Sequence, residues 1–236
     1  MILGILQCGH VPEQVRDDEG PYETLYANLV AGHGLTPRTF SVVDGIFPGG
    51  PEEADAWLVT GSKHGAYEDH PWIPPLEALL RDIRDSGQPL VGICFGHQII
   101  AQAFGGTVEK FDGGWSIGRQ TYRIGGAEAA LNAWHQDQIV TLPDGATKLG
   151  QSDFCANAVL TYGDRILTMQ PHPEFPNSVV EKLLDHRSDT VPEPLKSQAR
   201  AALDAPVANA LIGDWIAAVL KGAPAHHVPF APKASA

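Results

Sequence analysis

Short apolar runs alternate with amphipathic segments through the first half of the chain. Uninterrupted runs are typical of buried strands, whereas apolar residues three or four positions apart are typical of helices. We expect strands over residues 2–6, 41–43, 56–59 and 90–93, and helices over residues 21–31, 72–83 and 96–104. This alternation predicts an α/β fold in which helices cover both faces of a mostly parallel sheet.

The pattern changes between Thr107 and Met169. The apolar runs there are shorter, rich in Val, Thr and Tyr, and separated by turns such as Gly125-Gly126. Such runs predict strands and hairpins, so we expect a small antiparallel section beside the parallel sheet. The last of these strands is expected over residues 166–169.

The end of the chain indicates where the domain stops. Helical spacing returns after Pro176, and the last helix is expected over about residues 207–220. Prolines, alanines and two histidines follow Gly222. We therefore expect one domain over residues 1–222 and a flexible tail over residues 223–236.

Composition argues against several classes of function. The 236 residues are 43% hydrophobic, as in one compact domain, and the formal net charge of −12 argues against nucleic-acid binding. No apolar run approaches the roughly 18 residues that cross a bilayer, and the N-terminus lacks a signal-peptide pattern. Three cysteines without a CxxC pair favour reduced thiols, with Cys8 and Cys155 as ordinary buried residues. We expect a cytoplasmic protein with no nucleic-acid or membrane partner.

The third cysteine lies where a predicted strand turns into a predicted helix. Glycines stand two positions before and two positions after Cys94, at Gly92 and Gly96. A sharp strand-to-helix turn brings those two positions together and exposes the side chain between them above the sheet. The amides and dipole of the helix start would favour a reactive thiolate. Cys94 is therefore a candidate nucleophile, with a buried structural cysteine as the alternative.

A nucleophilic thiol needs a base, and the base needs a group that orients it. The strand expected over residues 166–169 leads into a loop with two prolines that carries His172 and Glu174. In this pair, His172 would accept the thiol proton and Glu174 would fix the imidazole. By itself, such a loop is most often only a turn, and its catalytic interpretation depends on its combination with Cys94.

Together, GICFGHQ (residues 92–98) and QPHPEF (170–175) resemble the class I glutamine amidotransferase family, whose triad is Cys, His and Glu. Three further segments are similar to motifs of that family in the same order: WLVTGSKHGAYED (57–69), GGWSIG (113–118) and AWHQDQI (133–139). The resemblance covers residues 56 to about 175. It implies a flavodoxin-like, three-layer fold and a triad of Cys94, His172 and Glu174.

The resemblance also implies which groups surround the reacting atoms. Backbone amides would form the oxyanion hole, those of Gly61 or Ser62 together with Phe95. Contacts to the glutamyl end of a substrate would come from Gln98 and from the backbone around Trp134 and His135. Neither a metal nor an organic cofactor is expected.

The segment GSKHGAYEDHPWI (61–73) is most similar to a stand-alone branch of the family that includes plant γ-glutamyl peptidases. Only about sixty residues follow Phe175, too few for an ATP-using synthetase domain. We therefore expect a hydrolase that cleaves a γ-glutamyl amide or peptide bond through a thioester, releasing glutamate and an amine. One alternative is a glutaminase subunit that supplies ammonia to a separate synthase. Another is a non-enzymatic redox sensor of the DJ-1 type.

Several polar and aromatic residues near these motifs allow more than one interpretation. His97 either faces the pocket or is capped locally, and Tyr67 and Trp115 could line the leaving-group side. Four residues could be mistaken for a metal cluster, namely His64, Glu68, Asp69 and His70. Their loop position and the resemblance favour a solvated rim of the substrate pocket.

Overall fold

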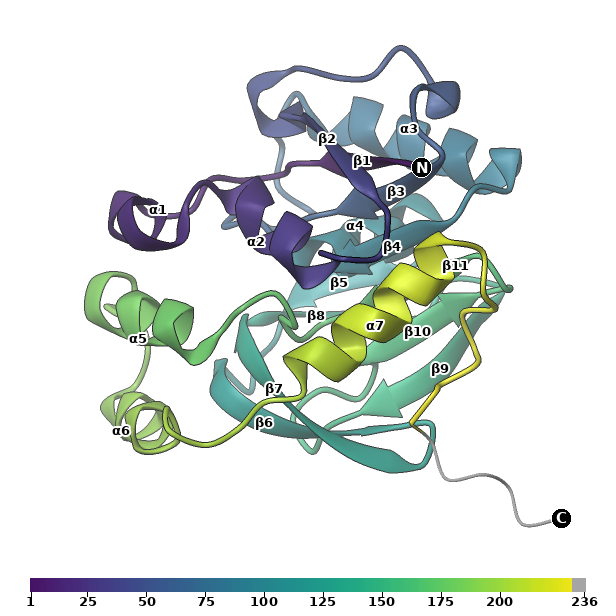
Figure 1. The fold of residues 1–236 in the computed structure, drawn as a ribbon. Helices are drawn as coiled ribbons and strands as arrows, with labels where there is room; N and C mark the ends of the chain where they lie inside the picture. The colour runs from purple at the N-terminus through teal and green to yellow at the C-terminus, as the bar shows by residue number, and fades with distance from the viewer. Residues whose placement is uncertain (231–236) are drawn as a thin grey trace, which may run out of the picture.

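The computed structural model describes residues 1–230 and contains a nine-stranded sheet of order β2-β1-β3-β4-β11-β10-β9-β6-β7 (Figure 1). Five neighbouring strands are parallel: β2 (Thr36–Phe40), β1 (Ile2–Leu6), β3 (Ala56–Val59), β4 (Leu90–Ile93) and β11 (Ile166–Met169). The others are antiparallel: β10 (Val159–Tyr162), β9 (Ala146–Gln151), β6 (Ser116–Ile124) and β7 (Ala127–His135). A separate pair joins β5 (Thr107–Lys110) to β8 (Asp137–Thr141).

Helices cover both faces of the parallel strands, as the alternating pattern predicts. Alternate residues of each strand point to opposite faces, so β1 contributes Leu3 and Ile5 to one core and Leu6 to the other. The first core contains side chains of α1 (Glu13–Glu19), α2 (Tyr22–Leu29), α5 (Asn177–His186) and α7 (Asn209–Leu220). The second contains those of α3 (Ile73–Ser86) and α4 (Phe95–Ala103). The predicted three-layer α/β fold with a small antiparallel section is confirmed.

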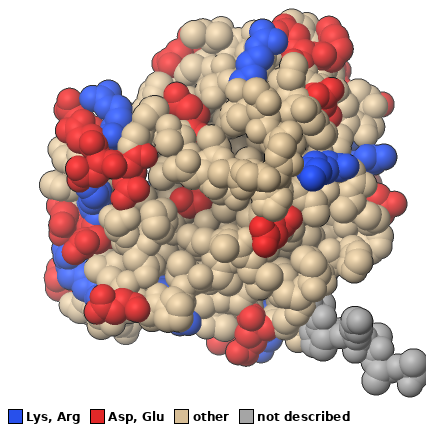
Figure 2. All heavy atoms as spheres, in the orientation of Figure 1, with Lys and Arg blue, Asp and Glu red and all other residues tan. Residues whose placement is uncertain are grey.

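Helix α6 (Glu193–Ala201) packs with α5 in a third, smaller cluster beside β6. Acidic and basic side chains gather along the edge formed by α1, α5 and α6, while most of the centre of this face is uncharged (Figure 2). Two ion pairs join elements there: Lys182 with Asp18, and Arg200 with Asp185. None of the helices within residues 1–230 combines the length and apolar character needed to cross a bilayer.

Two expectations about local structure differ from the observed fold. The strand expected over residues 41–43 is wrong: the edge strand is β2, at residues 36–40, and Val42–Asp44 form a 3₁₀ turn. Most of β2 is exposed, so it carries no apolar run, and its place is fixed by pairing with β1. The acidic run at residues 17–19 has a composition typical of a solvated loop, but it is the end of α1.

The segment after α7 does not leave the domain at Gly222. Ala225 and Val228 are buried, and the Ala225 amide donates a hydrogen bond of 2.9 Å to the carbonyl of Asp164. Residues 223–230 are therefore packed against the domain. The part of the expected tail at 231–236 lies outside the described residues.

Candidate active site

Cys94 occupies the tight turn between β4 and α4. Its φ of 54° is the only positive φ of a non-glycine residue within residues 1–230. A Cβ atom on Gly92 would lie 2.5 Å from the Gly96 carbonyl oxygen, and one on Gly96 would lie 2.3 Å from that of Val59. Since real Cβ atoms do not approach so closely, both positions require glycine. The predicted strand-to-helix turn is confirmed.

The parallel pairing of β4 with β11 brings the cysteine and the histidine loop to the same end of the sheet, where both strands have their carboxyl ends. Ile93 is in register with Met169, and the Cys94 amide donates a 2.8 Å hydrogen bond to the Met169 carbonyl. The carboxyl ends of neighbouring parallel strands emerge side by side. Residues 78 positions apart, Cys94 and His172, thus line one pocket.

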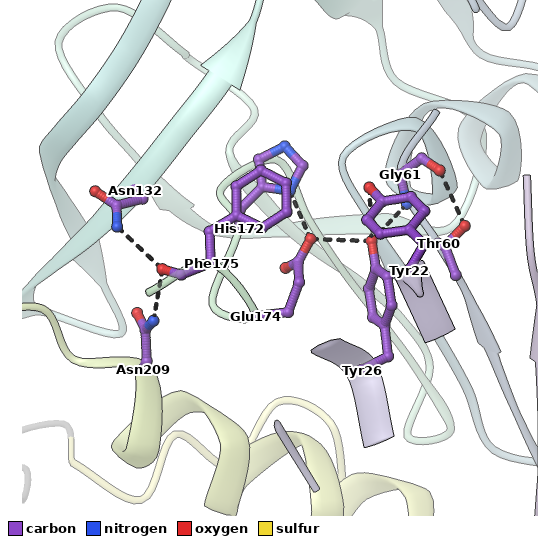
Figure 3. Close-up of polar contacts among 9 residues, drawn as sticks. All are labelled: Tyr22, Tyr26, Thr60, Gly61, Asn132, His172, Glu174, Phe175 and Asn209. Carbon is purple, nitrogen blue, oxygen red and sulfur yellow. Dashed lines mark hydrogen bonds and ion pairs between the residues drawn. The ribbon is translucent and has the colours of Figure 1, made fainter. Parts of the chain in front are cut away.

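His172 and Glu174 form a buried pair in the loop after β11. Nδ1 of His172 lies 2.6 Å from Oε1 of Glu174, and both side chains are almost fully buried (Figure 3). The imidazole stacks on the Phe175 ring at 4.1 Å, which fixes its plane. Asn132 and Asn209 both donate hydrogen bonds to the Phe175 carbonyl, at 3.0 and 2.8 Å. With Nδ1 donating to Glu174, Nε2 remains for proton transfer.

The charge balance at His172 favours the imidazolium. Burial alone would favour the neutral ring, but the electrostatic effects of Cys94 and Glu174, with the hydrogen bond to Glu174, outweigh it. Together they raise the pKa of His172 to about 10. A protonated His172 can act as a proton donor in the pocket that it lines together with Cys94.

Helix α2 supplies a residue to this network that the sequence interpretation missed. The Tyr26 hydroxyl donates to Oε1 of Glu174 at 2.9 Å and accepts the Gly61 amide at 2.7 Å (Figure 3). The Tyr22 hydroxyl lies 3.1 Å from that of Tyr26. Burial and the charge of Glu174 raise the pKa of both tyrosines well above 10, so both are neutral donors. The only signal in the sequence was the four-residue spacing of two tyrosines, which places them on one helix face.

The bond to Tyr26 corrects one expectation about the oxyanion hole. Because the Gly61 amide is engaged by Tyr26, it is not free to bind an oxyanion. The Thr60 hydroxyl also donates to the Gly61 carbonyl at 2.9 Å and fixes this peptide (Figure 3). Ser62, which lines the pocket, and Phe95, at the start of α4, remain as the candidate amide donors.

The residues expected to contact a glutamyl group do line the pocket with Cys94. The cavity has a volume of about 390 Å³, and Gln98, Trp134 and His135 form part of its wall. Gln98 Nε2 donates to the carbonyl of Asp137 at 2.9 Å, which orients the side chain. Burial lowers the pKa of His135 to about 3, so its ring is neutral. Its Nε2 is buried without a hydrogen-bond partner in residues 1–230.

His97 does not face the pocket. It is completely buried, with Nε2 at 2.9 Å from the Asn157 carbonyl and Nδ1 at 2.7 Å from the Thr168 hydroxyl. Nε2 therefore carries the proton and Nδ1 accepts from Thr168, while burial lowers the pKa of the ring to about 3. His97 is a structural histidine that connects α4 to distant parts of the chain, and neither sequence alternative describes it fully.

The mouth of the pocket contains the aromatic residues expected there. Tyr67 and Trp115 both line it, and the Tyr67 hydroxyl donates to Asp137 at 3.2 Å. His64 and Glu68 belong to the same rim, which bears out the expectation of a pocket-edge segment.

Several known proteins are similar to this chain in sequence. A family model described as "Glutamine amidotransferase class-I" matches residues 43–184, more than half of the chain. Gamma-glutamyl peptidase 3 of Arabidopsis thaliana is 28% identical over 190 residues, which cover 73% of this chain and 76% of the peptidase. A glutamine-hydrolyzing GMP synthase of Thermobifida fusca is 33% identical over 130 residues, 50% of this chain but 23% of the synthase.

A solved structure shows the same fold. The crystal structure of a glutamine amidotransferase from Thermotoga maritima superposes with a TM-score of 0.73. The match covers 93% of this chain and 95% of that one, at 22% sequence identity. The likeness therefore extends beyond the matched motifs to nearly the whole described domain.

Proposed function

Because this chain belongs to the class I glutamine amidotransferase family, we propose that it is a cysteine-dependent hydrolase of γ-glutamyl amide or peptide bonds. The observation that carries the proposal is that Cys94 and His172 line one pocket, while Nδ1 of His172 lies 2.6 Å from the buried carboxylate of Glu174. The similarity to a gamma-glutamyl peptidase supports hydrolysis as the overall reaction.

In the acylation step, the Cys94 thiolate attacks the γ-carbonyl carbon of the substrate. The carbonyl electrons move to oxygen, and the amides of Ser62 and Phe95 stabilise the resulting oxyanion. When the tetrahedral intermediate collapses, the carbon–nitrogen bond breaks and His172 gives its Nε2 proton to the leaving amine. The products are a γ-glutamyl thioester on Cys94 and a free amine.

Water completes the reaction. The now neutral His172 takes a proton from a water molecule, which attacks the thioester carbonyl. Collapse of the second tetrahedral intermediate breaks the carbon–sulfur bond and releases glutamate. The thiolate and the imidazolium are thereby restored. Throughout, Glu174 keeps the imidazole oriented and stabilises its positive charge.

Gln98, Trp134 and His135 are proposed to contact the glutamyl portion of the substrate. The three line the pocket with Cys94, which supports this assignment. His135 is neutral, so its unpartnered Nε2 is available as a hydrogen-bonding group without adding a buried charge.

A glutaminase subunit is the second candidate. The similarity to a glutamine-hydrolyzing GMP synthase favours it, because the same thioester chemistry releases ammonia when glutamine is the substrate. In that case a separate synthase would consume the ammonia, and hydrolysis by the chain alone would be slow.

Glutamate release by the purified chain tests both candidates. Glutamine, glutathione and a set of γ-glutamyl amines would be compared in the parent protein, Cys94→Ala and the matched control Cys155→Ala. Rapid turnover of a γ-glutamyl peptide or amine, lost only in Cys94→Ala, supports the self-sufficient hydrolase. Slow hydrolysis of glutamine alone favours the glutaminase subunit. Equal activity of Cys94→Ala and the parent would refute the mechanism, and no turnover with a readily oxidised Cys94 would favour the redox sensor.

A further inference from the structure

Three neighbouring side chains converge on one point beside the pocket, and two of them, His64 and Glu68, line it. Nε2 of His70 lies 2.7 Å and Nδ1 of His64 3.3 Å from the same oxygen, Oε2 of Glu68. One ligating atom from each of the three residues lies within 4.8 Å of the other two. The loop between β3 and α3 carries all three residues, which are partly exposed.

The surrounding structure holds these side chains in place. The His70 ring stacks on Trp72 with an angle of 14° between the planes, and Trp72 packs against Phe95 beside the nucleophile. Gln102 of α4 donates a 2.7 Å hydrogen bond to the Ala66 carbonyl in the middle of the loop. The ligand positions are thus supported by the second core rather than by the loop alone.

We propose that His64, Glu68 and His70 bind a divalent transition-metal ion of the Zn²⁺ type. Imidazole nitrogen and carboxylate oxygen are common ligands of such ions, at about 2.0–2.2 Å. In a tetrahedral site, ligand atoms at those bond lengths are about 3.4 Å apart. The observed separations from Oε2 of Glu68, 2.7 Å and 3.3 Å, are about 0.7 and 0.1 Å below this value, and the half-exposed Glu68 side chain can move by that amount.

The site would be open rather than closed. Three protein ligands leave at least one position of a four-coordinate ion for water or another donor. His64 and Glu68 also line the pocket that contains Cys94, so an ion there would lie at the substrate entrance. This site goes beyond the proposed hydrolysis, whose steps do not use it.

The test is direct binding of Zn²⁺ to the full chain carrying Cys94→Ala, which removes the thiol as a competing ligand. After dialysis against a chelator, isothermal titration is expected to show one Zn²⁺ per chain. Adding Glu68→Gln or His70→Ala is expected to weaken binding by at least roughly tenfold, since ligand loss exceeds the effect of outer-shell changes. The matched control is His33→Ala, which removes a histidine that pairs with Asp214 at 3.0 Å elsewhere on the surface.

Several results would overturn the proposal. These are the absence of Zn²⁺ binding to the Cys94→Ala protein, unchanged affinity in Glu68→Gln and His70→Ala, or an equal loss in His33→Ala. Thermal unfolding of each variant separates loss of the site from loss of the fold. Visible absorption of bound Co²⁺ gives a second readout, because its intensity reports four-coordinate geometry. Since all these measurements use a variant without the nucleophile, their outcome is independent of whether the proposed hydrolysis is correct.

Discussion

Tyr26→Phe isolates the link between helix α2 and the proposed triad. The substitution keeps the buried ring but removes the hydroxyl that donates to Glu174 at 2.9 Å and accepts the Gly61 amide at 2.7 Å. A hydrogen bond to a charged group contributes about 1.5–3 kcal/mol. If that contribution supports the charged imidazolium in the transition state, kcat/KM falls roughly 10- to 150-fold, because about 1.4 kcal/mol corresponds to a factor of ten.

The effect should appear in kcat rather than KM. Tyr26 is completely buried and does not line the substrate pocket, so substrate binding has no direct contact to lose. Steady-state glutamate release with the best γ-glutamyl substrate gives both constants. The matched control is Tyr122→Phe, because Tyr122 is also completely buried but its hydroxyl has no hydrogen-bond partner in residues 1–230. We expect the control to retain the parent kcat.

Two outcomes would refute this reasoning. A Tyr26→Phe protein that folds like the parent and keeps kcat/KM within about twofold would mean that the hydroxyl does not support the reaction. An equal loss of kcat in Tyr122→Phe would mean that any change in these buried tyrosines disturbs the site. Circular dichroism and thermal unfolding of both variants establish whether the fold is intact.

Three further predictions follow from contacts in the same region. Gly96→Ala should lower the free energy of unfolding by about 1–3 kcal/mol or more in urea denaturation, because its Cβ would meet the Val59 carbonyl at 2.3 Å; stability equal to the parent would contradict the tight turn. The pKa of His172 is raised from 6.5 to about 10, so its contribution to stability is full below pH 6.5 and is lost as the pH rises through about 10. The difference in Tm between the parent and His172→Gln should decrease over that pH interval, and the rate of acylation by the parent should fall as well. A Tm difference that stays constant with pH would argue against the raised pKa of His172. His97→Ala should lower the free energy of unfolding by at least about 1–3 kcal/mol, because it leaves the buried Thr168 hydroxyl without its hydrogen-bond partner. KM should stay near the parent value, and a large rise in KM would instead assign His97 to the pocket.

Much of the fold and the positions of the proposed triad could be predicted from the sequence because their signals are local. The turn at Cys94 needs small residues on both sides, and that requirement appears directly as Gly92 and Gly96. The strands β4 and β11 are short apolar runs, and both are fully buried. The residues that follow neighbouring parallel strands lie at the same end of the sheet. A cysteine after one strand and a histidine after the other can therefore be expected to lie close together.

The edge strand and the packed C-terminal segment could not be predicted in this way. Strand β2 is largely exposed and includes Pro37, so nothing in its pattern distinguishes it from a loop until β1 pairs with it. Ala225 and Val228 are small, scattered apolar residues among prolines and histidines. Their burial depends on contact with parts of the chain that precede them by many residues.

The sequence by itself determined which residues are the candidates for the proposed chemistry, because a strained turn and a stiff loop are properties of a few consecutive residues. Only the tertiary structure decided how those residues are supported. Tyr26 precedes Glu174 by 148 positions, and its hydroxyl donates a hydrogen bond to the Glu174 carboxylate. The same hydroxyl accepts a hydrogen bond from the amide of Gly61, one of the two amides considered for the oxyanion hole. The partner of a buried polar atom depends on how a helix packs over the edge of a sheet, whereas hydrophobic periodicity reports only which side of the helix is buried.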